Sequence, residues 1–152
     1  MRPLKRPIET LAPLLDGGTW TDVRGTAVGV TEAAVKGPGR VDMAVLMAPG
    51  VAAGVTTTST SAAAPCQWTR SLLPGPVHAT VVNAGNANAA TGERGVNDAR
   101  KTCSHLASLL ECDVKEVLPF STGVIGEFLP MEKILAGINR GFHALGPNHW
   151  GR

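Results

Sequence analysis

The chain has 152 residues, 43% of them hydrophobic and 17% charged, with a formal net charge of +2. That length suits one domain with a core of moderate size. The small, dispersed charge argues against a nucleic-acid surface, and no apolar run is long enough to span a membrane. Only 4% of the residues are aromatic whereas 18 are glycine, so we expect a core packed through small side chains and close backbone contacts.

Cysteine and histidine spacing predicts neither a disulfide framework nor a metal site. The cysteines are odd in number and form no CxxC pair, and the histidines have no metal-ligand spacing such as HExxH. The basic start of the chain lacks the apolar segment of a secretory signal. We therefore expect a protein of a reducing, cytoplasmic compartment with no bound metal. The residues concerned are Cys66, Cys103, Cys112, His78, His105, His143 and His149.

The first third of the chain predicts an arm followed by two strands. Residues 1–25 are rich in proline and glycine and show little periodicity, so we interpret them as an N-terminal arm. Residues 41–47 alternate and then become wholly apolar, which predicts a core strand. Pro49-Gly50 predicts a turn, and residues 51–58 predict a second strand that pairs with the first in an antiparallel hairpin.

The rest of the chain alternates helices and strands. Residues 64–73 fit a short helix with proline near its start, and residues 93–110 carry apolar side chains at helical spacing. Runs rich in β-forming residues at 78–83 and 117–120 predict strands, and residues 131–142 predict a last helix. This order predicts an α/β (α+β) domain of layered sheet and helices, with its loops gathered at strand ends.

A stretch rich in asparagine follows the predicted strand 78–83. Asn83, Asn86 and Asn88 lie among glycine and alanine residues. This pattern is typical either of a tight structural connection or of a polar pocket lined by amide groups. It is not a phosphate-binding or dinucleotide-binding fingerprint, because the lysine and the GxGxxG spacing are both missing.

A second small-residue loop, Ser121-Thr122-Gly123, is expected after the apolar run 117–120. One interpretation is a glycine turn whose threonine hydroxyl bonds the local backbone. The other is an oxyanion hole, in which the Thr122 hydroxyl and a backbone N–H converge on the negative oxygen of an acyl-transfer intermediate. The residues alone leave both interpretations open.

Two further sets of polar residues are predicted to lie on the protein surface and to have no catalytic role. The hydroxyl-rich run 56–61 has no adjacent base and predicts a strand edge and a loop. No Ser-His-Asp or Cys-His arrangement follows from the spacing. The charged residues of the 93–110 helix predict its solvated face. They are Glu93, Arg94, Asp98, Arg100 and Lys101.

Two motifs, in this order along the chain, resemble the ornithine acetyltransferase family, the bifunctional glutamate N-acetyltransferases of the cyclic arginine pathway. The first is NAGNANAATG at 83–92, and the second is STGVIG at 121–126, followed by LPM at 129–131. Shorter segments at 52–57, 63–65 and 68–70 are similar to the same family. The resemblance runs from about residue 24 to residue 152.

This resemblance implies the fold of the N-terminal half of the family, the alpha subunit, and transfer of an acetyl group from N-acetylornithine to glutamate. Some members also use acetyl-CoA as the acetyl donor. Family precursors cut themselves in two, and the threonine exposed at the start of the second subunit is the nucleophile, with its own amine as base. By position in the motif, Thr122 and Gly123 match the catalytic oxyanion-hole pair. The resemblance further implies a complementary beta subunit in a hetero-oligomer.

The sequence also departs from the family pattern. Ala84 and Ala90 stand where many members carry Ser and Cys, and Ser59-Thr60 replaces a more usual Asn-Arg. The chain ends before the threonine-rich substrate motif, the substrate lysine and the self-cleavage threonine, so no substrate-binding residue can be assigned. We expect residues 26–152 to form an incomplete N-terminal acetyltransferase domain that is inactive alone. The alternative is a non-catalytic remnant that binds a partner subunit or a small metabolite.

Overall fold

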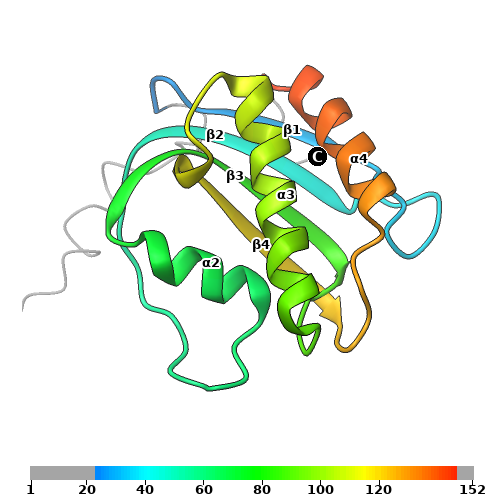
Figure 1. Cartoon of the computed structure of the whole chain (residues 1–152). Coiled ribbons are helices and arrows are strands. Elements are labelled where there is room, and N and C mark those ends of the chain that lie inside the picture. The colour runs from blue at the N-terminus through cyan, green and yellow to red at the C-terminus, as the bar shows by residue number, and fades with distance from the viewer. Residues whose placement is uncertain (1–22, 147–152) are drawn as a thin grey trace, which may run out of the picture.

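A four-stranded sheet organises the molecule, with its strands in the order β1-β2-β3-β4 (Figure 1). The computed structural model describes residues 23–146. β1 and β2 are antiparallel, as are β2 and β3, whereas β3 and β4 run parallel. The strands are β1 (Ala27–Thr31), β2 (Met43–Ala52), β3 (Gly75–Asn86) and β4 (Val117–Val124).

In the described part of the chain, three helices lie side by side over one face of the sheet, which gives a two-layer α/β architecture (Figure 1). The crossover between the parallel strands β3 and β4 passes through the longest helix, as parallel pairing requires. This arrangement confirms the predicted layered fold class. The helices are α2 (Ala64–Leu72), α3 (Gly92–Leu110) and α4 (Met131–His143), and a 3-10 turn, η2 (Val114–Glu116), precedes β4.

The core between the layers is built from small and medium apolar side chains. Val45 on β2, Leu106 on α3 and Ile138 on α4 are each fully buried. Among residues 23–146, the buried members of this cluster include no aromatic side chain, and Trp68 packs against it from the edge. Glycines let the backbones approach closely. Gly29 of β1 lies so near the Gly141 carbonyl that a side chain at position 29 would overlap with it. The predicted packing through small residues is therefore confirmed.

The predicted hairpin at Pro49-Gly50 is wrong. β2 continues through both residues to Ala52, and a register irregularity between Met47 and Gly50 accommodates the proline, which has no N–H for the ladder. Residues 53–58 form no strand and are mostly exposed, with Val55 fully exposed. The antiparallel partners of β2 are β1, which the sequence analysis missed, and β3.

The helix predictions are confirmed to within two residues at each end, whereas the strands are longer than predicted. Of the predicted arm, residues 1–22 lie outside the described part, and Val23 accepts a turn hydrogen bond from the N–H of Thr26 at 3.2 Å. Within residues 23–146, no helix has the length and apolar character needed to cross a membrane.

Candidate active site at the ends of β3 and β4

The parallel pairing of β3 and β4 brings the two polar motifs together. Asn83 pairs with Ser121, Ala84 with Thr122, and Gly85 with Gly123. Because the strands are parallel, both motifs lie at the carboxyl ends of adjacent strands, where α/β folds commonly place ligand sites. The two motifs are far apart in the sequence, and only the fold brings them together.

Thr122 and Gly123 lie within β4 rather than in a loop, which corrects the sequence prediction. The sheet extends through them because Gly85 and Gly123 allow the two backbones to meet closely. Gly123 has a φ of +132°, and a side chain there would overlap with the Gly85 carbonyl. Both Thr122 and Gly123 are exposed, and the Thr122 hydroxyl makes no hydrogen bond to any residue from 23 to 146.

Ser121 is tied to β3 by its side chain. Its hydroxyl donates to Asn83 Oδ1 at 2.7 Å, and Asn83 Nδ2 donates in turn to the Asn86 carbonyl at 2.9 Å. Asn83 is buried and Ser121 half-buried. The residue just before Thr122 therefore has a fixed position relative to the neighbouring strand.

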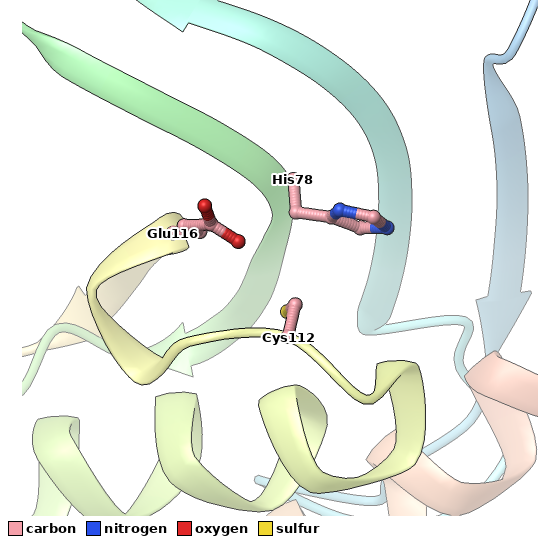
Figure 2. A group of neighbouring side chains, drawn as sticks. All are labelled: His78, Cys112 and Glu116. Atoms are coloured by element: carbon pink, nitrogen blue, oxygen red, sulfur yellow. The ribbon is translucent and has the colours of Figure 1, made fainter.

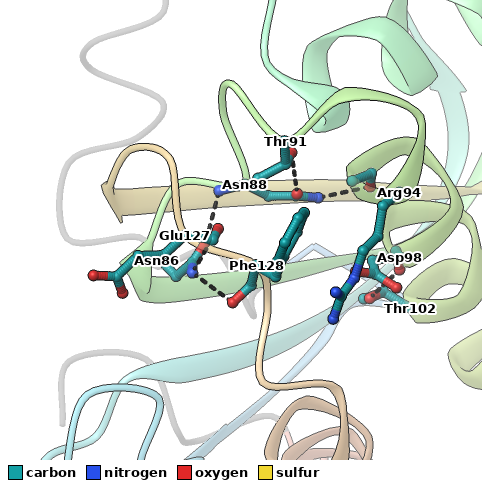
Figure 3. A network of polar contacts seen from close by, with 9 residues as sticks. Asn86, Asn88, Thr91, Arg94, Asp98, Thr102, Glu127 and Phe128 are labelled. Atoms are coloured by element: carbon teal, nitrogen blue, oxygen red, sulfur yellow. Dashed lines mark hydrogen bonds and ion pairs between the residues drawn. The ribbon is translucent and has the colours of Figure 1, made fainter.

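Asn86 and Asn88 extend this network to the segments on either side (Figure 3). Asn86 Nδ2 donates to the carbonyls of Glu127 and Phe128 at 3.2 and 3.1 Å, and its Oδ1 accepts from the Asn88 N–H at 2.7 Å. Asn88 is fully buried; its Nδ2 donates to the Gly95 carbonyl and its Oδ1 accepts from the Thr91 hydroxyl, both at 2.9 Å. These bonds hold the end of β3, the start of α3 and the chain after β4 in one arrangement.

The asparagines thus serve as structural connectors. The amide groups of all three are used in bonds to neighbouring backbone and side chains, so the interpretation as a tight polar connection fits them better than that of a ligand-lining loop. Their effect on a site would be indirect, through the placement of Ser121 and Thr122.

A cavity of about 530 Å³ lies between α2, β4 and the segment after β2. Its wall is mainly apolar, and Thr122 and Ser121 line it on the β4 side. Thr69 of α2 also lines it, and the Thr69 hydroxyl is buried without a hydrogen-bond partner in the described part. Thr69 is not predictable from the sequence, because nothing in a short helix marks which of its polar side chains faces a cavity.

The remaining polar predictions divide into two outcomes. The run 56–61 is a mostly exposed loop, as predicted, but no part of it is a strand edge. Arg70 donates to the Thr57 carbonyl at 3.4 Å. Asp98 was predicted on the solvated face of α3, but it is buried. Its Oδ2 lies 3.8 Å from Arg94 Nε, and the Arg94 guanidinium stacks 3.8 Å above the Phe128 ring. Asp98 thus belongs to the same network that anchors the segment after β4 (Figure 3).

Comparison with known proteins places this architecture in one family. Residues 27–149 match the ArgJ family model. The arginine biosynthesis bifunctional protein ArgJ of Pseudomonas syringae pv. tomato is 43% identical over 130 residues, which cover 84% of this chain and 32% of that protein. The ArgJ protein of Pseudomonas fluorescens is 38% identical over 146 residues, 95% of this chain and 34% of that protein.

Solved structures agree with this match. Ornithine acetyltransferase from Mycobacterium tuberculosis, complexed with ornithine, superimposes with a TM-score of 0.80 at 36% identity, over 84% of this chain and 71% of that chain. ArgJ from Bacillus halodurans gives a TM-score of 0.75 at 34% identity, over 86% of this chain and 74% of that chain. The chain spans about a third of the length of the curated relatives it matches. Its sheet, helices and paired motifs all fall within the matched stretch, and the chain belongs to the ArgJ family.

Proposed function

We propose that this chain supplies the oxyanion hole of an acetyl-transfer site, as the N-terminal portion of an ornithine acetyltransferase that moves an acetyl group from N-acetylornithine to glutamate in arginine biosynthesis. Thr122 Oγ–H and the Gly123 N–H would donate to the carbonyl oxygen as it becomes negative. Such donors act most strongly where charge develops in the transition state. Acetyl-CoA is a further acetyl donor to be tested in the same role.

The observation that supports this proposal most directly is the environment of the Thr122 hydroxyl. Its hydroxyl is exposed, has no hydrogen-bond partner among residues 23–146, and lies at the wall of the 530 Å³ cavity. A threonine that only closed a local turn would bond nearby backbone. The pairing of β4 with β3 fixes the backbone that carries Thr122 and Gly123, which supports their use as preorganised donors.

The proposal assigns the nucleophile to a complementary chain. An N-terminal threonine there would attack the acetyl carbon, its amine would take the proton, and ornithine would leave; the glutamate amine would then accept the acetyl group. The chain lengths support a two-chain enzyme. This sequence covers 71–74% of the solved family chains but about a third of the curated relatives, so those solved chains are less than half as long as the curated relatives.

The decisive experiment reconstitutes the site. This chain would be co-expressed with the part of the Pseudomonas syringae relative that follows the matched stretch, and acetyl transfer from N-acetylornithine to glutamate would be measured. Thr122→Ala is expected to lower kcat by about two to three orders of magnitude with little change in KM, because the lost bond forms fully only in the transition state. Thr122→Ser keeps the hydroxyl and is expected to retain most of the activity.

Two results would contradict the proposal. Unchanged turnover in Thr122→Ala would remove Thr122 from the oxyanion hole. Activity of this chain alone would contradict the assignment of the nucleophile to a second chain. Thermal melting of each variant controls for folding, since an exposed side chain with no hydrogen bond in the described part should change Tm little when it is truncated.

A further inference from the structure

Three potential metal ligands converge at the end of the sheet opposite the active-site motifs, and the proposed acetyl transfer uses none of them. His78 belongs to β3, Cys112 follows α3, and Glu116 ends η2. One ligand atom from each residue lies within 4.8 Å of the other two, and all three side chains are half-buried (Figure 2).

The backbone fixes each of these residues independently. Glu111, the residue that caps the end of α3, has the left-handed conformation. The Cys112 N–H donates to the Ala107 carbonyl at 3.1 Å, which fixes the position of Cys112 relative to the helix. Asp113 caps η2 by accepting from the Lys115 N–H at 2.9 Å. Pairing of Ala79 with Val117 then brings the residues before them, His78 and Glu116, to the same level of the sheet.

Among residues 23–146, no hydrogen bond joins the His78 ring, the Cys112 thiol or the Glu116 carboxylate to another residue, and the thiol accepts only from the backbone N–H of Cys112 itself. Elsewhere in the described part, the His105 ring does pair with a neighbour, Asn139, at 2.9 Å. These three side chains instead share a space with one another, and binding a cation would break no bond to another described residue.

We propose that His78, Cys112 and Glu116 form a binding site for Zn²⁺ or a similar divalent transition metal, with water at the fourth position. Nitrogen, thiolate sulfur and carboxylate oxygen are the ligands of zinc, whereas Mg²⁺ and Ca²⁺ select oxygen alone. A point equidistant from atoms 4.8 Å apart lies about 2.8 Å from each, against metal–ligand bonds of about 2.0–2.3 Å. Each side chain must therefore move inward by about 0.5–0.8 Å, which rotation of half-exposed side chains provides.

The spacing of cysteine and histidine in the sequence predicts no metal site. Cys112 and Glu116 are four residues apart, but the third ligand, His78, belongs to β3, which precedes α3 in the sequence. A bound metal would link β3, the end of α3 and the start of β4. It would stabilise the crossover that positions both strands of the site, without touching the reacting atoms.

Cobalt(II) is the probe, because its visible absorption reports geometry and its near-ultraviolet absorption reports thiolate coordination. Titration of the purified, chelator-treated chain with Co²⁺ is expected to give both bands, and added Zn²⁺ should displace them. Cys112→Ser should abolish the thiolate band, whereas Cys66→Ser, at the other half-buried cysteine, should leave it unchanged. A wild-type chain without the bands, or a band retained in Cys112→Ser, would overturn the proposal.

A second variant guards against a folding defect at position 112. His78→Gln removes a ligand from the strand, and it should weaken Zn²⁺ binding, measured by calorimetry, by at least about tenfold, since even outer-shell partners contribute about 10–100-fold. Zn²⁺ should also raise the Tm of the wild-type chain in a concentration-dependent way and raise that of His78→Gln less. Equal Zn²⁺ affinity in wild type and His78→Gln would exclude this site. None of these readouts depends on acetyl transfer, so they test the metal site separately from the proposed function.

Discussion

At the scale of single residues, Cys103 lies on the buried face of α3. Its side chain has no exposed surface and belongs to the central apolar cluster with Leu106 and Val117. Burial raises the pKa of the Cys103 thiol from its ordinary value of 9.0 to about 12. The thiol is therefore a packing group, and it stays neutral in the folded chain well into the alkaline range.

This pKa shift predicts an alkaline loss of stability. Between pH 9.0 and about 12 the unfolded chain loses the Cys103 proton while the folded chain keeps it. The free energy of unfolding should fall as pH rises through this window, by up to about 1.4 kcal/mol per pH unit from this group. Below pH 9.0 the thiol is neutral in both states and contributes no pH dependence.

The measurement is urea unfolding of the wild type and Cys103→Ala across that pH range. Other groups titrate in both proteins, so the difference between their pH slopes isolates the thiol. The variant should be less stable at neutral pH, because it leaves a cavity, but its stability should fall less steeply above pH 9.0. Parallel slopes would show that the buried thiol ionises as easily as an exposed one.

At the scale of secondary-structure elements, the asparagine network joins β3, α3 and the segment after β4. Asn88 is its most enclosed member, with a φ of +47° that asparagine tolerates better than most residues. It bonds both the Gly95 carbonyl and the Thr91 hydroxyl at the start of α3. The Thr91 side chain makes no capping hydrogen bond to the helix backbone, so the bonds of Asn88 fix the start of α3 instead.

Asn88→Ala should therefore destabilise the chain by about 1–3 kcal/mol, because two buried polar groups lose their partner. The expected reading is a lower midpoint in urea unfolding with an unchanged m-value. Asn97→Ala is the matched control, since Asn97 is exposed on α3 and alanine favours helix there. A loss in Asn88→Ala no larger than in Asn97→Ala would mean that the network does not hold the elements together.

The elements that the sequence predicts well are those whose signal is periodic. Helices α3 and α4 follow from apolar spacing alone. β1 was missed because Gly29 interrupts its apolar alternation, and that glycine is required only because the Gly141 carbonyl of α4 packs against it. The local sequence at Pro49-Gly50 predicts a turn that would end β2 there. Pairing with β3 overrides this turn signal, and β2 continues to pair with β3 after the irregular register between Met47 and Gly50.

The candidate site divides in the same way. Thr122 and Gly123 could be named from the family motif, but their place in β4 could not, since Gly123 extends the strand only by meeting Gly85 in parallel register. Thr69 and the ligand trio of His78, Cys112 and Glu116 depend on contacts between distant segments. No local pattern encodes such contacts, so they emerge only once the sheet is assembled.

At the scale of the whole molecule, one side of the chain carries unusual apolar exposure. In the described part β4 pairs with β3 alone and is an edge strand of the sheet. Phe120 on this strand is 45% exposed, and Val55, which lines the 530 Å³ cavity together with Phe120, is 100% exposed. Apolar residues gathered around a cavity, beside an unpaired strand edge, are typical of a surface that another chain covers.

Phe120 is the residue that tests this interface, because its ring lines the cavity next to Thr122. A buried aromatic anchor commonly contributes 2 kcal/mol or more to association, on the order of a thirtyfold change in Kd. In co-expression with the remaining part of the Pseudomonas syringae relative, Phe120→Ser should therefore reduce recovery of the two-chain complex by at least about tenfold. Its effect on the Tm of this chain alone should be small, since nearly half of the ring is already in water.

Val41→Ser is the control for that experiment. Val41 is 69% exposed but lies in the loop before β2 and does not line the cavity. Its replacement should leave recovery of the complex unchanged. If Phe120→Ser and Val41→Ser assemble equally well, the complementary chain does not cover the face of β4. Thr122 would then face solvent instead of a second chain's nucleophile, and the proposed division of the active site between two chains would fail with it.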